Sequence, residues 1–467
     1  MDSAIQHQRI PSGLDAETRL FWYSRHTAAI ALFFYFLIVL AISCVIPPLQ
    51  PPDEMPHIMR AYLLSRGDVF LGTKDGKTGG YIDTGLLAYM SSFGDLLGHY
   101  EKKVATEVRS SSRINWSGRR EFTPLFSTAV YFPLPYLPQA SAFAIGERIG
   151  LSPEATCYLG RLFSLAATLG LLWCALILYP MPPVVVTLFA TPMTLFQLGS
   201  ATLDPVTFGT CALTSALFLR GSDPQRSFDT RLHLALALCV FSLATSRIAM
   251  LPLTLLPATL YKLRRSRVYL LTSAASFCLS ICWILFAFVS VKGMPSRAVS
   301  TLDTAKHYLE HPTSLFRIVL HTFWNGDVMQ WYWSMFIGLL GEVDTPLDPY
   351  VYAVFAVLFI VLIALSLQRD TASWTDPRKL LLLSVALVCL GLNFILELLT
   401  WTTSNARVIG GIQGRYFTPI WIFIGYSILG RKLSPLELRC GVLVLLVALT
   451  LSIVSMIPKL LYRYWVS

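Results

Sequence analysis

Charged residues are scarce in this chain of 467 residues: Asp, Glu, Lys and Arg make up only 14% of it, while 54% is hydrophobic. A soluble protein carries charges at roughly a quarter of its positions. The scarcity of charge therefore excludes an ordinary soluble domain. Several apolar runs reach or approach the ~20 residues that a helix needs to cross a bilayer. The composition predicts an all-α polytopic membrane protein.

The chain also lacks paired cysteine motifs, and we expect its first apolar run not to be a cleaved leader. Its nine cysteines lie mostly inside apolar runs, and no CxxC pair is present. This pattern argues against both a disulfide framework and a zinc site. Mostly polar residues precede the first apolar run, and no small-x-small cleavage site follows it. We expect residues 1–27 to form a cytoplasmic N-terminus followed by a retained helix.

The apolar runs predict about 11 to 13 transmembrane helices in a single membrane domain, 1–467. Two longer polar stretches, 47–128 and 292–348, are expected to be external loops. The first of them includes a candidate amphipathic helix at Met55–Arg66 and a glycine-rich turn at Gly76–Gly80. The apolar runs lie at about 28–46, 130–146, 155–179, 183–200, 204–219, 232–261, 268–291, 349–367, 380–400, 416–430 and 437–457.

Lysine and arginine collect in short loops between the apolar runs, and the net charge is +10. Positive charge of this kind marks loops as cytoplasmic, so it requires no nucleic-acid partner. The basic loops lie at 220–231, 262–267, 369–379 and 431–432.

Two apolar runs are irregular. The run 232–261 has basic loops at both ends and contains Arg247 and Pro252, which predicts a helical hairpin with Arg247 near its tip. A basic residue at that depth is usually functional. The run 183–200 is interrupted by prolines and is expected not to span fully, which places Asp204 on the external side.

Two adjacent carboxylates, Asp53 and Glu54, follow the first apolar run in a segment with five prolines between Pro47 and Pro56. Proline fixes φ and removes a donor, so this segment cannot continue the helix. Acids held rigidly at the water boundary suggest catalysis or ion binding. The alternative interpretation is a solvated loop that only ends the helix.

Loop orientation places several charged residues on one side of the membrane. They are Asp53, Glu54, Asp204, Asp344 and Arg415. Transfer of a sugar from a lipid-linked phosphate to a hydroxyl needs a carboxylate that accepts the hydroxyl proton. It also needs positive charge at the phosphate leaving group, and arginine suits phosphate because its planar fork donates two parallel hydrogen bonds. The pattern suggests Asp53 or Glu54 as the base and Arg415 as the phosphate ligand.

Other candidates each have two interpretations. His57 can contact phosphate or orient a carboxylate, or it can be a simple loop contact. Asp204 can be a second acid of the site or the N-cap of the next helix. Tyr131 and Tyr136 can face sugar or lipid, or they can anchor the chain at the membrane interface, as can the aromatic cluster at 324–333.

Six motifs occur in a fixed order: P-P-D-E-x-x-H-x-x-R-A-Y (51–62), Y-x-P-x-x-Y-L-P (131–138), G-R (160–161), Q-x-x-S-x-x-x-D (197–204), G-L-L-G (338–341) and G-x-Q-G-R-Y-F-x-P (411–419). Together they resemble a bacterial membrane family catalogued as domain of unknown function 2142. The resemblance covers nearly the whole chain. At two positions the chain departs from the family: Arg247 stands where lysine is usual, which keeps the positive charge, and Glu342 stands where an aromatic residue is usual.

This family resembles the GT-C glycosyltransferase superfamily in layout, with a cytoplasmic N-terminus, an acid in the first external loop, juxtamembrane helices and many spans. GT-C enzymes use polyprenyl-phosphate sugars, usually with inversion at the anomeric carbon. The resemblance implies this class of enzyme. Within it, the acids and arginines on one side of the membrane suggest that Arg415 and Arg247 would hold the phosphate, while Gln413 and Tyr416 would shape the pocket.

The sequence thus predicts a glycosyltransferase in the bacterial cytoplasmic (inner) membrane, with its site facing the periplasm or cell exterior. It would move a sugar from a polyprenyl-phosphate carrier to a cell-envelope glycan or glycolipid, in contact with membrane lipid and without nucleic acid. Asp53 would be the base and Glu54 its helper. A divalent cation, Mg or Mn, held by Asp53, Glu54 and Asp204 is left open.

The alternative is a transporter or flippase of a lipid-linked or anionic substrate, because transporters also place charged residues on broken helices. The absence of an internal repeat and the gathering of charges at one face favour the transferase. A third interpretation, an assembly scaffold, does not account for the stiffened acidic loop.

Overall fold

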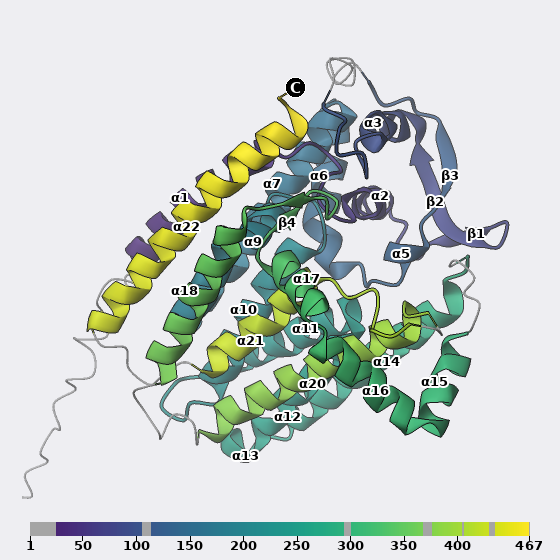
Figure 1. The fold of residues 1–467 in the computed structure, drawn as a ribbon. Helices are drawn as coiled ribbons and strands as arrows, with labels where there is room; N and C mark the ends of the chain where they lie inside the picture. The colour runs from purple at the N-terminus through teal and green to yellow at the C-terminus, as the bar shows by residue number, and fades with distance from the viewer. Residues whose placement is uncertain are drawn as a thin grey trace, which may run out of the picture.

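The computed structural model describes residues 25–104, 114–293, 300–367, 376–403, 406–428 and 435–466. The expected cytoplasmic N-terminus, 1–27, lies almost wholly outside these described residues, as do Arg369, Arg431 and Lys432 of two expected cytoplasmic loops. The described backbone is mainly helical, as the composition predicts (Figure 1).

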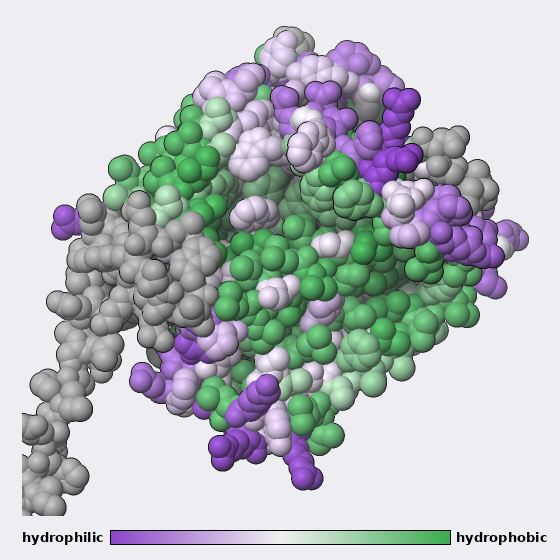
Figure 2. Space-filling view, turned by 60° about the horizontal axis from the view of Figure 1, so that its bottom comes forward, coloured by the Kyte–Doolittle hydropathy of each residue, from purple (hydrophilic) through white to green (hydrophobic). Residues whose placement is uncertain are grey.

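Six helices in the described part of the chain are long and apolar enough to cross a membrane, judged by length and composition. They are α1 (Arg25–Val45), α7 (Pro153–Leu178), α14 (Val268–Ser290), α18 (Pro349–Leu367), α20 (Pro377–Thr400) and α22 (Pro435–Tyr464). Many of their apolar side chains are exposed, such as Phe288 and Val289 of α14, at 72% and 75%. Figure 2 shows a broad hydrophobic area on one face, with hydrophilic residues at opposite ends. An exposed apolar surface of this extent suits contact with lipid, and the chain is a multi-pass membrane protein.

Other apolar runs form shorter or broken helices. The run 183–200 consists of α8 (Pro183–Phe189) and α9 (Pro192–Leu198), each beginning at a proline, which confirms the expected break. The run at 130–146 contains α6 (Leu137–Arg148), whose 12 residues are too few to span a bilayer. The predicted total of about 11 to 13 spans includes such short segments and stays a prediction.

The run 232–261 folds back on itself, as predicted. α11 (Thr230–Ser246) ends at Arg247, whose backbone is extended, with φ −145° and ψ 103°. The returning segment packs against α11 and contains Pro252, which disfavours a regular α-helix. It comprises the 3₁₀ segment η2 (Ile248–Leu255) and the short helices α12 (Leu256–Thr259) and α13 (Tyr261–Arg264). Arg247 therefore lies at the tip of a hairpin.

Helix α10 (Asp204–Gly221) lies at the centre of the bundle and is buried along nearly its whole length. It packs against α7, α11, α20 and α21 (Phe417–Ser427). At its C-terminal end, Arg264 and Arg378 donate hydrogen bonds to backbone carbonyls of the loop 221–226. Three of the expected cytoplasmic loops thus meet at one end of α10, ~24 Å along the helix from Asp204.

The first expected external stretch, 47–128, forms helices and a small antiparallel sheet of strand order β1-β2-β3. The predicted amphipathic segment is a helix, and the glycine-rich segment supplies both the turn at Gly76 and the start of β2. The sequence gives little strand signal here, because glycine weakens strands. A Cβ on Gly79 would lie 2.1 Å from the carbonyl oxygen of Thr123, so glycine permits the close pairing. The elements are α2 (Glu54–Ser65), β1 (Gly72–Lys74), β2 (Lys77–Asp83), α3 (Thr84–Gly94), β3 (Arg120–Pro124) and α5 (Phe126–Ala129), followed by η1 (Leu134–Tyr136).

In the second expected external stretch, 292–348, the described residues 292–293 and 300–348 form three helices and a two-stranded hairpin. Of its aromatic cluster, Trp324 and Trp331 are exposed and Tyr332 is buried, so only part of the cluster can act as an interface anchor. The elements are α15 (Thr301–Glu310), α16 (Pro312–Trp324), α17 (Gly326–Ile337), β4 (Leu339–Leu340) and β5 (Thr345–Pro346).

The short turn η3 (Gly414–Tyr416) packs on α17. A Cβ on Gly414 would lie 2.1 Å from the carbonyl oxygen of Tyr332 and 2.5 Å from the backbone nitrogen of Phe336. Only glycine therefore allows this turn to rest directly on the α17 backbone, and that contact fixes the position of the next residue, Arg415.

Candidate active site

Four charged residues from four separate parts of the chain meet at one end of the bundle. Arg415 donates from Nη2 to Oδ2 of Asp53, and its Nη1 lies 3.4 Å from Oδ2 of Asp204. Arg247, at the hairpin tip, donates to Oδ1 of Asp204. The structure therefore brings Asp53, Arg415, Asp204 and Arg247 into one alternating chain of charges.

Asp53 has a backbone conformation that directs it to Arg415. It precedes α2 in the N-cap position, yet its φ of 63° is left-handed and its side chain makes no capping hydrogen bond. Aspartate tolerates this conformation better than most residues. Its side chain is 52% exposed. Partial burial alone raises the pKa of Asp53, but the charge and hydrogen bond of Arg415, together with the other positive groups nearby, outweigh it and hold the pKa below its usual value.

Arg415 is buried and held on several sides. Its Nε donates to Oε1 of Gln413 at 2.6 Å, and its Nη1 also lies 3.3 Å from the carbonyl oxygen of Pro52. Its guanidinium carbon lies 5.3 Å from the ring centre of Tyr416, and that of Arg247 lies 5.4 Å from the same ring. Both arginines therefore contact one aromatic ring, where cation–π attraction adds to the ion pairs.

His57 and two tyrosines lie beside these charges. Nδ1 of His57 shares a hydrogen bond of 2.6 Å with the hydroxyl of Tyr136, and its ring stacks at 6.1 Å on Tyr131. Burial lowers the pKa of His57 to about 4, although the negative charges of Asp53 and Asp204 act in the opposite direction. His57 is thus neutral at neutral pH and can offer a ligand a hydrogen bond but no charge.

The structure separates Glu54 from the predicted site. Its side chain is fully buried and paired with Arg161, whose Nε and Nη2 lie 2.8 Å and 2.6 Å from its two oxygens. The backbone nitrogens of Ala201 and Leu49 donate to the same oxygens at 2.8 Å and 2.9 Å. A carboxylate has about four acceptor positions, and all four are occupied. This arrangement leaves Glu54 no position for a proton or a metal ion, which corrects the expectation that it assists Asp53.

Asp204 is an acid of the cluster and not a helix cap. Leu203 occupies the N-cap of α10, and no side-chain capping bond forms there. Among the described residues, no group of three or more His, Cys, Asp or Glu side chains is arranged to hold a metal ion. With Glu54 engaged elsewhere, a divalent cation stays a prediction that would depend on Asp53 and Asp204.

Two further acids border the cluster without having been singled out by spacing. Oε2 of Glu397, on α20, is buried without a partner among the described residues, and the charge of Arg247 acts on it. Glu342 lies in the turn between β4 and β5, where surrounding protein and the charge of Asp53 raise its pKa to about 7 although part of the side chain is exposed. A lone acid inside an apolar run was the available signal for Glu397.

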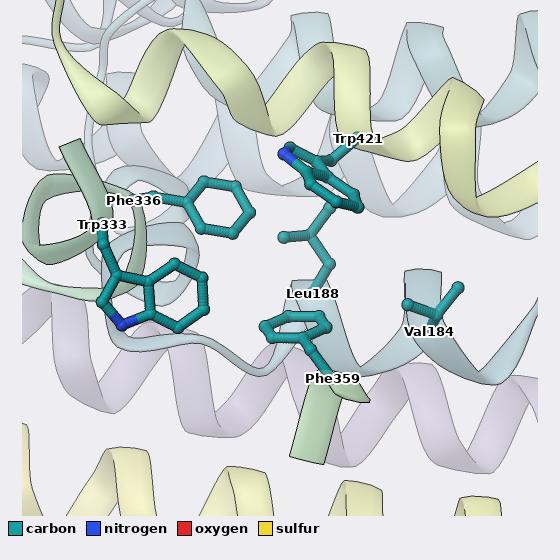
Figure 3. A pocket seen from close by; sticks show the side chains of 6 residues that line it. All are labelled: Val184, Leu188, Trp333, Phe336, Phe359 and Trp421. Carbon is teal, nitrogen blue, oxygen red and sulfur yellow. The ribbon is translucent and has the colours of Figure 1, made fainter. Parts of the chain in front are cut away.

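An apolar pocket lies a short way along the bundle from Arg415. Figure 3 shows the rings of Trp333, Phe336, Phe359 and Trp421 around it. Trp421 lies on α21, six residues after Arg415 of the preceding turn η3. The pocket is lined by aromatic and aliphatic side chains, which are Val184, Leu188, Trp333, Phe336, Phe359 and Trp421.

Comparison with known proteins shows the family of this chain. The sequence model of a family described as "Predicted membrane protein (DUF2142)" matches residues 36–424. A structure search finds similarity to ArnT from Cupriavidus metallidurans, solved bound to undecaprenyl phosphate, over 91% of this chain and 77% of that one, with 12% identity and a TM-score of 0.33. At that similarity no site residue is carried over. No curated protein matches the chain.

Proposed function

This chain belongs to the DUF2142 family of membrane proteins, and from that premise we propose that it is a GT-C-like glycosyltransferase using a polyprenyl-phosphate sugar donor. The observation that carries the proposal is the meeting of Asp53, Arg415, Asp204 and Arg247 at one end of the bundle. Two arginines there suit a phosphate, and a half-exposed carboxylate beside them suits a hydroxyl acceptor.

The neighbouring apolar pocket supports a lipid-linked donor. A polyprenyl phosphate has an anionic head and a long apolar tail. Arg415 lies in the turn just before α21, and Trp421, one of the aromatic residues of the pocket, lies on α21. With the head at Arg415, the first part of the tail would lie beside Trp421. Aromatic walls bury such a chain with favourable contact.

In this proposal the donor phosphate competes with Asp53 for Arg415. Arg415 then stabilises the leaving phosphate together with Arg247, while Asp53 is released toward the acceptor. The acceptor O–H bond breaks and its proton passes to Asp53, a new C–O bond forms at the anomeric carbon, and the bond from that carbon to the phosphate oxygen breaks with its electron pair. Loss of the contact with Arg415 would also raise the basicity of Asp53 at the step where a base is needed.

The expected location is the bacterial cytoplasmic membrane, with the site at its outer face and a cell-envelope glycan or glycolipid as acceptor. The support is the arrangement of charge along α10. Asp204 and the other site residues lie at its N-terminal end, and three basic loops lie at its C-terminal end. Positive loops prefer the cytoplasmic side, so the site would face outward.

The test is Asp53→Asn in purified protein, supplied with an undecaprenyl-phosphate sugar and an envelope acceptor fraction. Asparagine keeps the size of the side chain but cannot take the proton. We expect release of free undecaprenyl phosphate to fall ~100-fold or more with an unchanged unfolding temperature. Asp348→Asn, at an acid paired with Lys459 away from the cluster, serves as the matched control. Full activity of Asp53→Asn would rule out its role as base.

A transporter or flippase is the second candidate, because the structure contains a hairpin broken at Arg247 and a span broken between α8 and α9. Transporters place binding sites at such breaks. Reconstituted vesicles separate the two functions. A transferase releases sugar-free undecaprenyl phosphate, whereas a flippase moves the intact glycolipid between leaflets.

A further inference from the structure

Two buried polar atoms next to the charge cluster have no hydrogen-bond partner among the described residues. They are Oε2 of Glu397, an acceptor, and Nε of Arg247, a donor. Buried polar atoms are nearly always paired, so each exception needs an explanation. Here the two exceptions are complementary. Glu397 lies on α20, which packs against η2, the segment that directly follows Arg247, and the two side chains form no ion pair in the described structure.

Each of these two groups is fixed by its surroundings but not by the other. Arg247 is held by Asp204 and lies over Tyr416. Glu397 lies beneath the loop that leads to Arg415, where a Cβ on Gly411 would stand 2.7 Å from its free oxygen. Gly411 has a φ of +82°, which glycine adopts at no steric cost. The loop therefore passes close to Glu397 without supplying a donor to it.

Tyr416 borders both groups. Its ring lies 5.4 Å from the Arg247 guanidinium carbon, and Glu397 acts on it electrostatically. A free acceptor, a free donor and an aromatic ring are the elements that recognise a polyol, because hydroxyl groups both donate and accept hydrogen bonds. A phosphate would satisfy Arg247 but not the carboxylate of Glu397.

We propose that Glu397 and Arg247 form the subsite that binds the sugar of the donor, with Glu397 accepting a hydrogen bond from one sugar hydroxyl and Nε of Arg247 donating to another. This assignment rests on the proposed transferase function and adds the part of the site that distinguishes a sugar-linked carrier from the bare lipid phosphate. The ligand class is a sugar with free hydroxyl groups.

The experiment compares Glu397→Leu with wild-type protein in binding two kinds of lipid. Leucine preserves the volume in an apolar helix and removes the acceptor, while Glu397→Gln keeps a weaker acceptor. The probes are undecaprenyl phosphate and its glucose, mannose, galactose and arabinose derivatives. Loss of a buried hydrogen-bond acceptor weakens binding, so we expect the best sugar derivative to bind ~10-fold or more weakly to Glu397→Leu.

Undecaprenyl phosphate itself should bind equally to both proteins, and Glu397→Gln should fall between them for the sugar derivative. Glu310→Gln, at an exposed residue of α15, is the matched control and should bind like wild type. Equal losses for sugar-linked and sugar-free lipid, or no loss for either, would overturn the sugar subsite while leaving the transferase proposal in place. If wild-type protein binds no lipid phosphate at all, the transferase proposal fails and the subsite with it.

Discussion

Replacing Glu54 by glutamine should destabilise the protein, whereas replacing its neighbour Asp53 by asparagine should not. The Glu54 side chain is 0% exposed and that of its partner Arg161 is 4% exposed. Removing one member of a buried ion pair leaves the other charge unpaired, at a cost of about 3–5 kcal/mol. Glutamine would also point an amide N–H₂ at donors that now meet a carboxylate oxygen. Asp53 is half-exposed, and Arg415 would still contact Asp204.

The measurement is the thermal unfolding temperature of each purified variant in the same detergent. Arg161→Met should lower the unfolding temperature by a similar amount, because this substitution leaves the buried Glu54 carboxylate without its ion-pair partner. Glu147→Gln is the matched control: its ion pair with Arg66 is partly exposed, and pairs of that kind are worth under ~1 kcal/mol. We expect wild type, Asp53→Asn and Glu147→Gln to unfold at similar temperatures. Glu54→Gln and Arg161→Met should unfold at clearly lower temperatures.

A different outcome would refute the structural role of Glu54. If Glu54→Gln unfolds at the wild-type temperature and yet loses transfer, its carboxylate takes part in the chemistry. The four hydrogen bonds to it would then have to open during the reaction.

Two other predictions concern the turns on either side of the cluster. The pKa of Glu342 is raised from 4.5 to about 7, first by burial and second by Asp53. The folded protein therefore binds this proton more tightly than the unfolded chain does. Stability should fall as the pH rises from about 4.5 to about 7. Glu342→Gln should flatten the fall in unfolding temperature measured across this pH range, and an unchanged slope would contradict the assignment. Gly414→Ala should lower both transfer and unfolding temperature, since its Cβ would collide with the α17 backbone; an active, fully stable Gly414→Ala would show that the η3 contact is adjustable.

Sequence reasoning could anticipate the meeting of Asp53, Asp204 and Arg415 because two simple constraints act together. A transmembrane helix must run from one face of the bilayer to the other. Positively charged loops then indicate which helix ends lie together on the cytoplasmic side. The prolines in 183–200 indicate that this run does not span fully, which places Asp204 on the external side, and α8 and α9 show the break there. These constraints give the end of the bundle at which a residue lies, but not its lateral neighbours.

Other features were missed because the sequence does not indicate which residues lie side by side at the same level of the bundle. Arg161 faces Glu54 through a separation of 107 positions, and no local pattern encodes such a pair. The sheet β1-β2-β3 depends on the close pairing of Gly79 with the β3 backbone, a tertiary contact that overrides weak strand propensity. Glu397 carried a signal, as an acid in an apolar run, but its free oxygen becomes meaningful only beside Arg247.

The divergence of Asp53 and Glu54 follows from helix geometry. Successive residues of an α-helix point ~100° apart, so residues at i and i+1 do not face the same partner. At the start of α2 the left-handed φ of Asp53 turns the two side chains further from a common direction. One carboxylate reaches Arg415 at the cluster, and the other reaches Arg161 in the protein interior. Two adjacent acids at a helix start are therefore better interpreted as one acid for the site and one for the fold, since a shared site would require both to point the same way.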